Sequence, residues 1–184
     1  MKILVHLCCA PCFVYPYKVL SREQHEIFGF FFNPNIHPYQ EYQRRMETVQ
    51  NWTEEAGIRM IYRDEYQLEN FLRSIIYREN KRCLFCYHTR LLATAQIAAN
   101  GKFDCFTTTL LYSKFQKHET IAKIGTELGQ QYGVQFYYQD FREGWKEGIT
   151  LSKKLGLYRQ QYCGCIYSEK DRYWQADKKA PTPE

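Results

Sequence analysis

Short apolar segments rich in aromatic and β-branched residues alternate with longer segments of helical periodicity along this chain. We expect strands at residues 2–7, 26–32, 58–62, 105–108 and 134–138. We expect helices at about 16–22, 39–55, 67–77, 83–99, 114–132 and 143–155. Strands that alternate with helices form βαβ units, which predict an α/β fold with a doubly wound, mostly parallel sheet.

The chain is expected to form a single domain, because its 184 residues contain no repeat, low-complexity segment or linker. We place this α/β domain at residues 1–177 and a frayed tail with two prolines at 178–184. No apolar run is long enough to cross a bilayer and no signal peptide is recognisable. We therefore expect a cytoplasmic protein with no membrane partner.

The eight cysteines point to chemistry rather than to disulfides, since cytoplasmic thiols stay reduced. One cluster directly follows the first predicted strand, and open α/β sheets place their chemistry at the carboxyl ends of strands. We therefore expect a cysteine-rich metal site at that edge of the sheet. The clusters are Cys8, Cys9 and Cys12 after the strand, Cys83 and Cys86 at a helix start, and Cys163 and Cys165 near the C-terminal end.

Seven clustered thiols exceed what one metal ion needs. A tetrahedral zinc takes four ligands, whereas seven suffice for a four-cysteine iron–sulfur cluster and a second metal with three. Adjacent Cys8 and Cys9 reach one ion only with strain, so we expect them to serve neighbouring centres. A structural zinc site and a thioredoxin-like redox pair remain alternatives. Cys105 lies in an apolar strand and is interpreted as a small buried hydrophobe.

Charge and aromatic content are compatible with an RNA-binding surface. The net charge is +5, and several of the 16 tyrosines stand close to an Arg or Lys in the sequence. Single-stranded RNA needs positive charge for its phosphates and aromatic faces for its bases. A solvated basic surface over a tyrosine-rich core is the alternative. Candidates for phosphate contacts are Arg44, Arg45, Arg90, Arg142 and Arg159.

Six sequence blocks occur in an order that resembles one known family. They are 6–12 (HLCCAPC), 33–38 (NPNIHP), 83–87 (CLFCY) with 90–91 (RL), 107–113 (TTTLLYS), 140–142 (DFR) and 158–165 (YRQQYCGC). Together, from about residue 2 to residue 168, they resemble the cobalamin-independent epoxyqueuosine reductases, the QueH family.

This resemblance implies an oxidoreductase that removes the epoxide oxygen from epoxyqueuosine at the wobble position of tRNA, giving queuosine in the final step of its biosynthesis. It also implies a HUP-like (Rossmann-like) fold, a 4Fe-4S cluster and an adjacent mononuclear metal, expected to be iron. The expected partners are tRNA carrying epoxyqueuosine and an external one-electron donor such as a ferredoxin or flavodoxin. Some family members carry Asp in the place of Cys12, which marks this position as a ligand of the second metal.

Within this scheme the cysteines receive separate roles. Cys9, Cys83, Cys86 and one cysteine of the CGC pair, with Cys163 preferred, are assigned to the cluster. Cys8, Cys12 and Cys165 are then assigned to the second metal. Cys8 and Cys12 also join the catalytic set, because that metal is expected to face the substrate.

Asp140 completes the catalytic set. It follows the last predicted strand at the same sheet edge and could supply protons or a hard oxygen ligand. The alternative is an N-cap for the next helix.

Other polar residues of this edge are weaker candidates. Tyr112, Ser113 and His118 follow the fourth strand, and Ser113 is also a candidate N-cap. His6, inside an apolar strand, is interpreted as a hydrogen-bonded core histidine. His37, in a proline-flanked loop, could approach substrate or bond to backbone.

Two other functions compete with this interpretation. A zinc-stabilised RNA-binding module without redox activity would be colourless, whereas an iron–sulfur protein is brown. A HUP-type enzyme that uses ATP on tRNA carries an SGGxDS-like phosphate loop after its first strand. Residues 8–12 (CCAPC) have no such phosphate-binding geometry, so ATP use is not expected.

Overall fold

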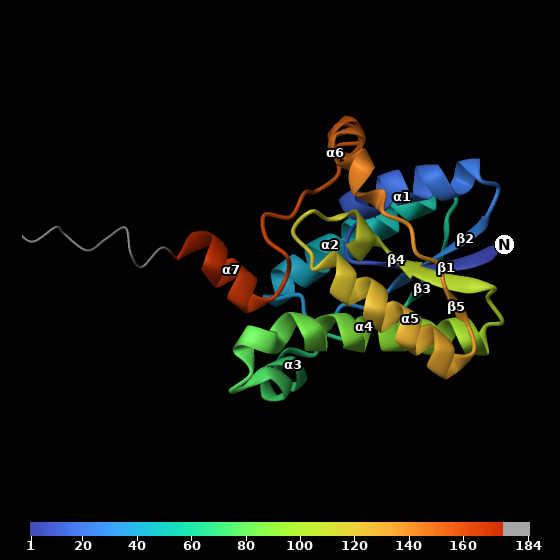
Figure 1. Cartoon of the computed structure of the whole chain (residues 1–184). Coiled ribbons are helices and arrows are strands. Elements are labelled where there is room, and N and C mark those ends of the chain that lie inside the picture. Colours follow the sequence, from blue (N-terminus) through green and yellow to red (C-terminus); the bar gives the residue numbers. More distant parts are fainter. Residues whose placement is uncertain (175–184) are drawn as a thin grey trace, which may run out of the picture.

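Five parallel strands form one sheet in the computed structural model, which describes residues 1–174 (Figure 1). The sheet order is β3-β2-β1-β4-β5, and every neighbouring pair is parallel. The strands are β1 (Lys2–Leu7), β2 (Glu26–Phe31), β3 (Arg59–Tyr62), β4 (Cys105–Thr108) and β5 (Gln135–Phe136). The predicted domain end at residue 177 and the tail at 178–184 lie outside the described residues.

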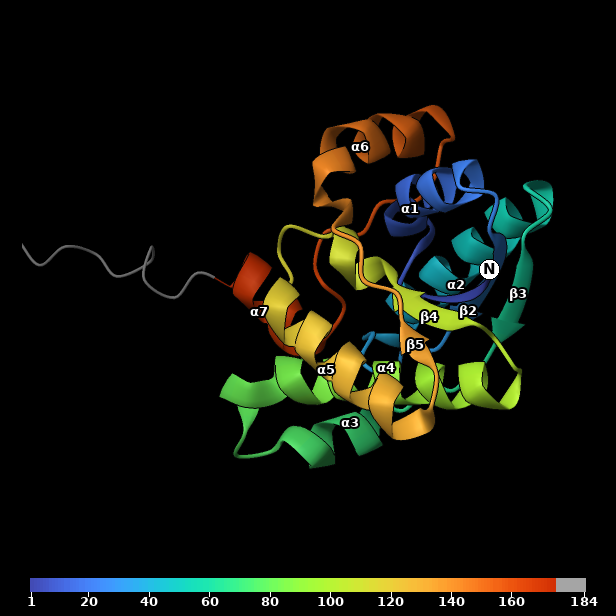
Figure 2. The same cartoon turned by 45° about the vertical axis from the view of Figure 1, so that its right-hand side comes forward.

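Helices cover both faces of the sheet (Figures 1 and 2). Helices α1, α2 and α6 lie on one side, and α3, α4 and α5 on the other, as expected for a doubly wound sheet. The helices are α1 (Ala10–Arg22), α2 (Tyr39–Glu55), α3 (Leu68–Ile75), α4 (Arg82–Asn100), α5 (His118–Tyr132), α6 (Trp145–Lys154) and α7 (Ile166–Tyr173). Three short 3-10 helices are η1 (Glu79–Lys81), η2 (Thr109–Tyr112) and η3 (Phe141–Gly144).

The chain changes direction between β1 and β4. From β1 it winds outward to β2 and β3, then crosses to the other side of β1 for β4 and β5. Loops after β1 and β4 therefore leave toward opposite faces, which opens a crevice at the carboxyl ends of these two strands. Cys8 and Thr109 face each other there, with the Cys8 N–H donating to Thr109 Oγ1 over 3.4 Å.

The central strand explains the continuous apolar run at the start of the sequence. Every residue from Ile3 to Leu7 is fully buried, because helices cover both faces of β1. His6 lies in this strand, within hydrogen-bonding distance of Thr108 Oγ1 (2.9 Å) and the Phe32 carbonyl (3.2 Å). Burial lowers its pKa to about 3, so it is a neutral core histidine, as predicted. Cys105, also fully buried in β4, is the small core residue expected.

The first helix starts earlier than predicted. It begins at Ala10, directly after the first cysteines, rather than near Pro16. Pro11 occupies the first turn, where a missing N–H costs nothing. Pro16 instead lies inside the helix, where it has no N–H to donate to the carbonyl of Cys12.

Three other elements differ most from the predictions. α5 begins at His118 rather than Lys114, because Ser113 caps a separate turn by accepting from the Phe115 N–H. β5 contains only two residues, since the chain leaves the sheet after the Tyr137 N–H bonds the Phe106 carbonyl. α7 occupies a segment for which no helix was predicted; none of its residues is buried, so it has no apolar periodicity to recognise.

Over residues 1–174, the helices are all too short or too polar to cross a lipid bilayer. All eight cysteines are free thiols.

Candidate metal centre and its cavity

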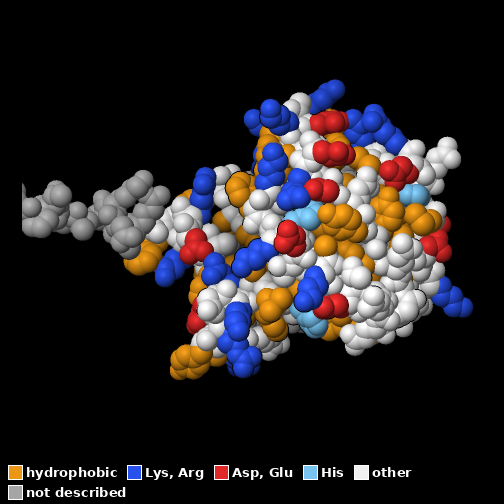
Figure 3. Space-filling view, viewed as in Figure 1, with side chains coloured by type: hydrophobic (Ala, Val, Ile, Leu, Met, Phe, Trp, Pro, Cys, Tyr) orange, Lys and Arg blue, Asp and Glu red, His pale blue; other side chains and the backbone are white. Residues whose placement is uncertain are grey.

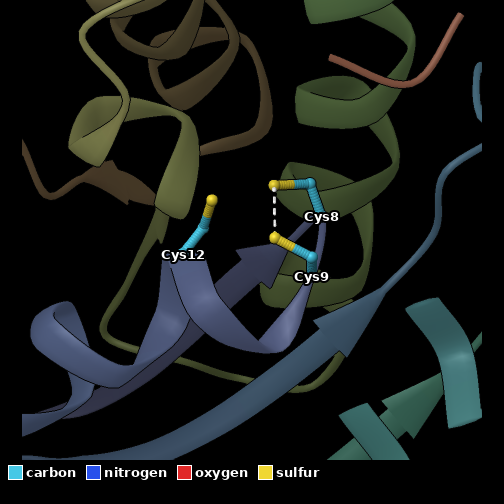
Figure 4. Close-up of side chains that lie close together, drawn as sticks. All are labelled: Cys8, Cys9 and Cys12. Atoms are coloured by element: carbon cyan, nitrogen blue, oxygen red, sulfur yellow. Dashed lines mark hydrogen bonds between the residues drawn. The ribbon is translucent and has the colours of Figure 1, made fainter. Parts of the chain in front are cut away.

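The first cysteine group converges at the carboxyl end of β1. Cys8 follows the strand, Cys9 is the N-cap residue of α1, and Cys12 lies in the first turn of that helix. The Cys8 and Cys9 sulfurs are 3.8 Å apart, and all three sulfurs lie within 4.8 Å of one another (Figure 4). None of the three is more than 8% exposed.

This spacing fits a single metal ion. Two thiolates bound at about 2.3 Å in tetrahedral geometry lie ~3.8 Å apart, which matches the separation of Cys8 and Cys9. Adjacent cysteines therefore need not serve separate centres here, since the strand-to-helix turn points both side chains the same way (Figure 4).

The three thiols shift one another's pKa in different directions. The neighbouring thiols of Cys12 and Cys9, aided by the charges of Arg90 and Arg45, hold the pKa of Cys8 well below its usual range. The pKa of Cys9 is raised, mainly by burial, and that of Cys12 is raised mainly by its hydrogen bonds to Cys8 and Cys9.

The other four clustered cysteines form a second group. Cys83 and Cys86 lie at the start of α4, and Cys163 and Cys165 lie in the segment before α7. Cys86 and Cys165 share a small apolar cluster with residues of α3. Burial raises the pKa of Cys86 to about 12; charge on the other three thiols adds to this effect and Arg90 opposes it. Among the described residues, only the first group has three donor atoms within 4.8 Å of one another, so the second group is more widely spaced.

Gly164 allows the chain to turn between Cys163 and Cys165. Its φ of +141° is a conformation that favours glycine. A Cβ at this position would lie 3.1 Å from Ile36 Cγ1 and 3.3 Å from both Arg45 Nη1 and Asn35 Nδ2. The central glycine of the CGC motif is therefore required by both backbone angle and space.

Hydrogen bonds hold this C-terminal segment against the loop before α2 and against α2 itself. Arg45 donates to the carbonyls of Tyr162 and Cys163, and each donor–acceptor distance is 3.0 Å. The His37 N–H donates to the Gly164 carbonyl (2.8 Å), and the Tyr162 hydroxyl donates to the His37 carbonyl (2.6 Å). The segment that carries the last two cysteines is thus fixed by residues more than a hundred positions earlier.

Two buried arginines flank the thiols. Arg45 pairs with Glu41 over 2.7 Å, and Arg90 donates to the Cys86 sulfur over 3.0 Å. Each is only 1% exposed. The burial of Arg45 contradicts its predicted contact with an RNA phosphate at the surface. Arg90 also lines the cavity described below, so its predicted contact stays a prediction. Arg44 is exposed and stacks on Tyr158.

A cavity of about 480 Å³ opens beside the cysteines. Cys8 and Cys12 from the first group and Cys163 from the second contribute to its wall. Two glutamines fix thiols at this wall: Gln160 donates to the Cys12 sulfur (3.4 Å) and Gln116 to the Cys163 sulfur (3.2 Å). Both groups of thiols therefore meet at one opening.

Aromatic and basic side chains complete the cavity. Tyr112 and Trp145 pack at 5.2 Å between ring centres, and Phe115 packs edge-on against Trp145. Phe115 is 84% exposed, an unusual position for a large apolar ring. Arg159, a predicted phosphate contact, and Arg172 also line the cavity.

The structure gives Asp140 a capping position. Its carboxylate accepts from the Arg142 N–H, as the N-cap of η3, and pairs with the Arg142 guanidinium. These bonds lower its pKa to about 2. Asp140 is not among the described residues that line the cavity. The capping alternative is thus confirmed, and a catalytic role stays a prediction.

The remaining candidates are divided between the cavity and the interior. Tyr112 and Ser113 line the cavity, whereas His118 bonds the Tyr138 hydroxyl over 3.0 Å. His37 is buried against Phe71, 5.0 Å between ring centres.

Several cavity residues were missed by sequence reasoning, although some lie beside recognised motifs. Gln160 stands inside the block that ends in CGC, but a lone glutamine carries no chemical signature. The missed residues include Thr109, Phe115, Gln116, Trp145, Gln160 and Arg172.

The fold is shared with a solved tRNA-modifying enzyme. The U34-tRNA thiolase NcsA from Methanococcus maripaludis, solved with its [4Fe-4S] cluster, superposes with a TM-score of 0.63 at 18% identity. The alignment covers 91% of this chain and 61% of the thiolase chain. At this identity the likeness concerns the fold alone.

Sequence comparison gives a narrower result. The family model described as epoxyqueuosine reductase QueH matches residues 3–171. A relative of that name from Dehalococcoides mccartyi is 34% identical over 97% of this chain and 98% of its own length. Another, from Thermotoga maritima, is 36% identical over 92% of this chain and 91% of its own length. The chain belongs to the epoxyqueuosine reductase QueH family.

Proposed function

We propose that this chain reduces epoxyqueuosine in the wobble position of tRNA to queuosine, the final step of queuosine biosynthesis. The reaction removes the epoxide oxygen and leaves an alkene, which consumes two electrons and two protons. The observation that carries the proposal is the convergence of two cysteine groups on one cavity, at Cys8, Cys12 and Cys163. The identity of the substrate is inferred from the family to which the chain belongs.

The thiols fit two metal centres. Four cysteines supply a complete set of ligands for a 4Fe-4S cluster. The buried triad has the spacing that a single metal ion needs, and we propose that this mononuclear metal is iron. Bound there, the cluster would supply electrons one at a time and the metal ion a Lewis acid next to the cavity.

The cluster is proposed to use Cys83, Cys86 and Cys163, as the sequence predicted. For the fourth ligand, the sequence favoured Cys9. The packing of Cys165 with Cys86 supports Cys165 instead, which would leave Cys8, Cys9 and Cys12 together for the mononuclear ion.

The chain's own residues prepare the cavity for a modified nucleoside. Tyr112, Trp145 and Phe115 present an aromatic surface to the cavity. Gln160 and Gln116 orient their thiols by donating to sulfur, which fixes where the metal-binding atoms face. A proton-transfer role for Asp140 stays a prediction; as a carboxylate it must gain a proton before it can donate one.

The tRNA is proposed to approach over the basic side of the molecule. Lys and Arg side chains gather where α6, α7 and the start of α4 lie (Figure 3). Arg159 and Arg172 at the cavity would contact phosphates, and exposed Phe115 would stack on a base. We further propose a ferredoxin or flavodoxin as electron donor, and the cytoplasm as the location of the reaction.

The test is direct. Anaerobically reconstituted protein is incubated with reductant and tRNA bearing epoxyqueuosine, and the nucleosides are analysed by mass spectrometry. We expect loss of one oxygen from the modified base. A colourless protein that binds zinc and leaves the base unchanged would instead support an RNA-binding module without redox activity.

A further inference from the structure

Arg90 is a buried cation that lacks a carboxylate partner. Its side chain is 1% exposed, and no Asp or Glu forms an ion pair with it within residues 1–174. Arg45, the comparable cation of α2, pairs with Glu41. A buried guanidinium without negative charge nearby is strongly unfavourable. The fold must therefore balance Arg90 in another way.

Arg90 contacts one cysteine directly and shares the cavity wall with cysteines of both groups. Its Nη2 donates to the Cys86 sulfur over 3.0 Å, and its Nε donates to the Cys86 carbonyl over 3.1 Å. Burial by itself would lower the pKa of Arg90, but charge on Cys86, Cys163 and Cys8 raises it above its ordinary value. Arg90 also lines the cavity. It thus stands between the two groups at the point where they meet.

We propose that Arg90 is a positioning residue that balances the negative charge of the metal-loaded thiolates and raises the reduction potential of the cluster bound at Cys86. This inference rests on the proposed function. A cluster gains one negative charge when an external one-electron donor reduces it, so a fixed positive charge beside a ligand sulfur favours the reduced form. The hydrogen bond from Arg90 to that sulfur acts in the same direction.

The test is a potentiometric titration of the reconstituted protein, followed by visible absorbance and electron paramagnetic resonance. Arg90→Gln and Arg90→Met remove the charge, whereas Arg90→Lys keeps it. At a fixed potential, we expect the ratio of reduced to oxidised cluster to be at least tenfold lower in the neutral variants than in the unmodified protein. For a one-electron couple, a tenfold change corresponds to a fall of about 59 mV in the reduction potential. Arg90→Lys should shift by less than half of that. Arg59→Gln is the matched control, because Arg59 is exposed at the amino end of β3 and pairs with Glu26.

Each outcome decides the matter. An unchanged potential in Arg90→Gln, or an equal shift in Arg90→Lys, overturns the role of the charge. Loss of the cluster from the neutral variants but not from Arg90→Lys supports it, whereas loss from all three variants assigns Arg90 a purely geometric role. Absence of a cluster from the unmodified protein would overturn the proposed function itself.

Discussion

The side-chain amide of Gln160 donates to the sulfur of Cys12 over 3.4 Å and joins segments 148 residues apart in the sequence. This bond connects the stretch before CGC to the first turn of α1, so the mouth of the cavity is built from both ends of the chain. It also orients a thiol of the proposed mononuclear site.

Removing this bond should weaken metal binding. We expect Gln160→Leu to lower the affinity of the triad for its ion by roughly 10–100-fold, the usual effect of losing an outer partner of a metal ligand. Metal retention against a graded chelator measures the change. Gln161→Leu is the control, because the Gln161 amide bonds a backbone carbonyl. Equal metal loss from both variants would contradict this role.

The fourth cluster ligand can be identified by comparing two variants. If Cys165 completes the cluster, Cys165→Ala should lose most labile sulfide and iron, whereas Cys9→Ala should keep the sulfide and lose the mononuclear ion. Iron and sulfide analysis of anaerobic samples gives the answer. The reverse pattern would restore the assignment of Cys9 that the sequence suggested.

Gly164 should tolerate no side chain. Gly164→Ala combines a strained φ of +141° with close contacts to Ile36, Asn35 and Arg45, and we expect it to lower the free energy of unfolding by about 1–3 kcal/mol. Gly156 also has a positive φ, +63°, but a Cβ added there would have no neighbour within 4 Å. Gly156→Ala should therefore cost less in urea unfolding and leave cluster content unchanged. A larger loss in Gly156→Ala would argue against crowding at Gly164.

Phe115 should contribute to tRNA binding through stacking. We expect Phe115→Ala to weaken the binding of anticodon stem-loop RNA by roughly 1–3 kcal/mol, since one base–aromatic stack has about this value. Filter binding at fixed salt measures it. Tyr77, 92% exposed at the α3–α4 connection, is the control because it lies outside the cavity lining. A similar loss in Tyr77→Ala would show that the effect is not specific to the cavity.

The two interpretations of Asp140 predict different behaviour of Asp140→Asn. Asparagine is an equally good N-cap, so a capping role leaves stability nearly unchanged. Because Asp140 is bonded to Arg142 and lies outside the cavity lining, we expect this variant to retain most of its turnover. Measuring kcat across pH 6–8 checks this, and Asp140→Ala tests the cap. A large drop in kcat with unchanged stability would instead establish a catalytic role.

The sequence by itself determined the fold class and predicted which cysteines belong to the thiol site. An apolar run such as 2–7 indicates a strand that is covered on both faces of the sheet. The structure confirms this burial for the residues from Ile3 to Leu7. The seven clustered cysteines needed no structure to be recognised, because their spacing within each motif is local. His6 and Cys105 were also interpreted correctly as core residues, because both lie inside apolar strands.

Tertiary structure decided how these pieces meet. The turn from β1 into α1 brings Cys8 and Cys9 to single-ion distance, which local spacing argued against. Arg90 and Arg45 looked like surface charges, but packing buried them among thiols. Contacts across more than a hundred residues, such as those from Arg45 to the Cys163 carbonyl and from Gln160 to Cys12, leave no periodic trace in a sequence. They arise only when the sheet and its two helical layers bring distant segments to one edge.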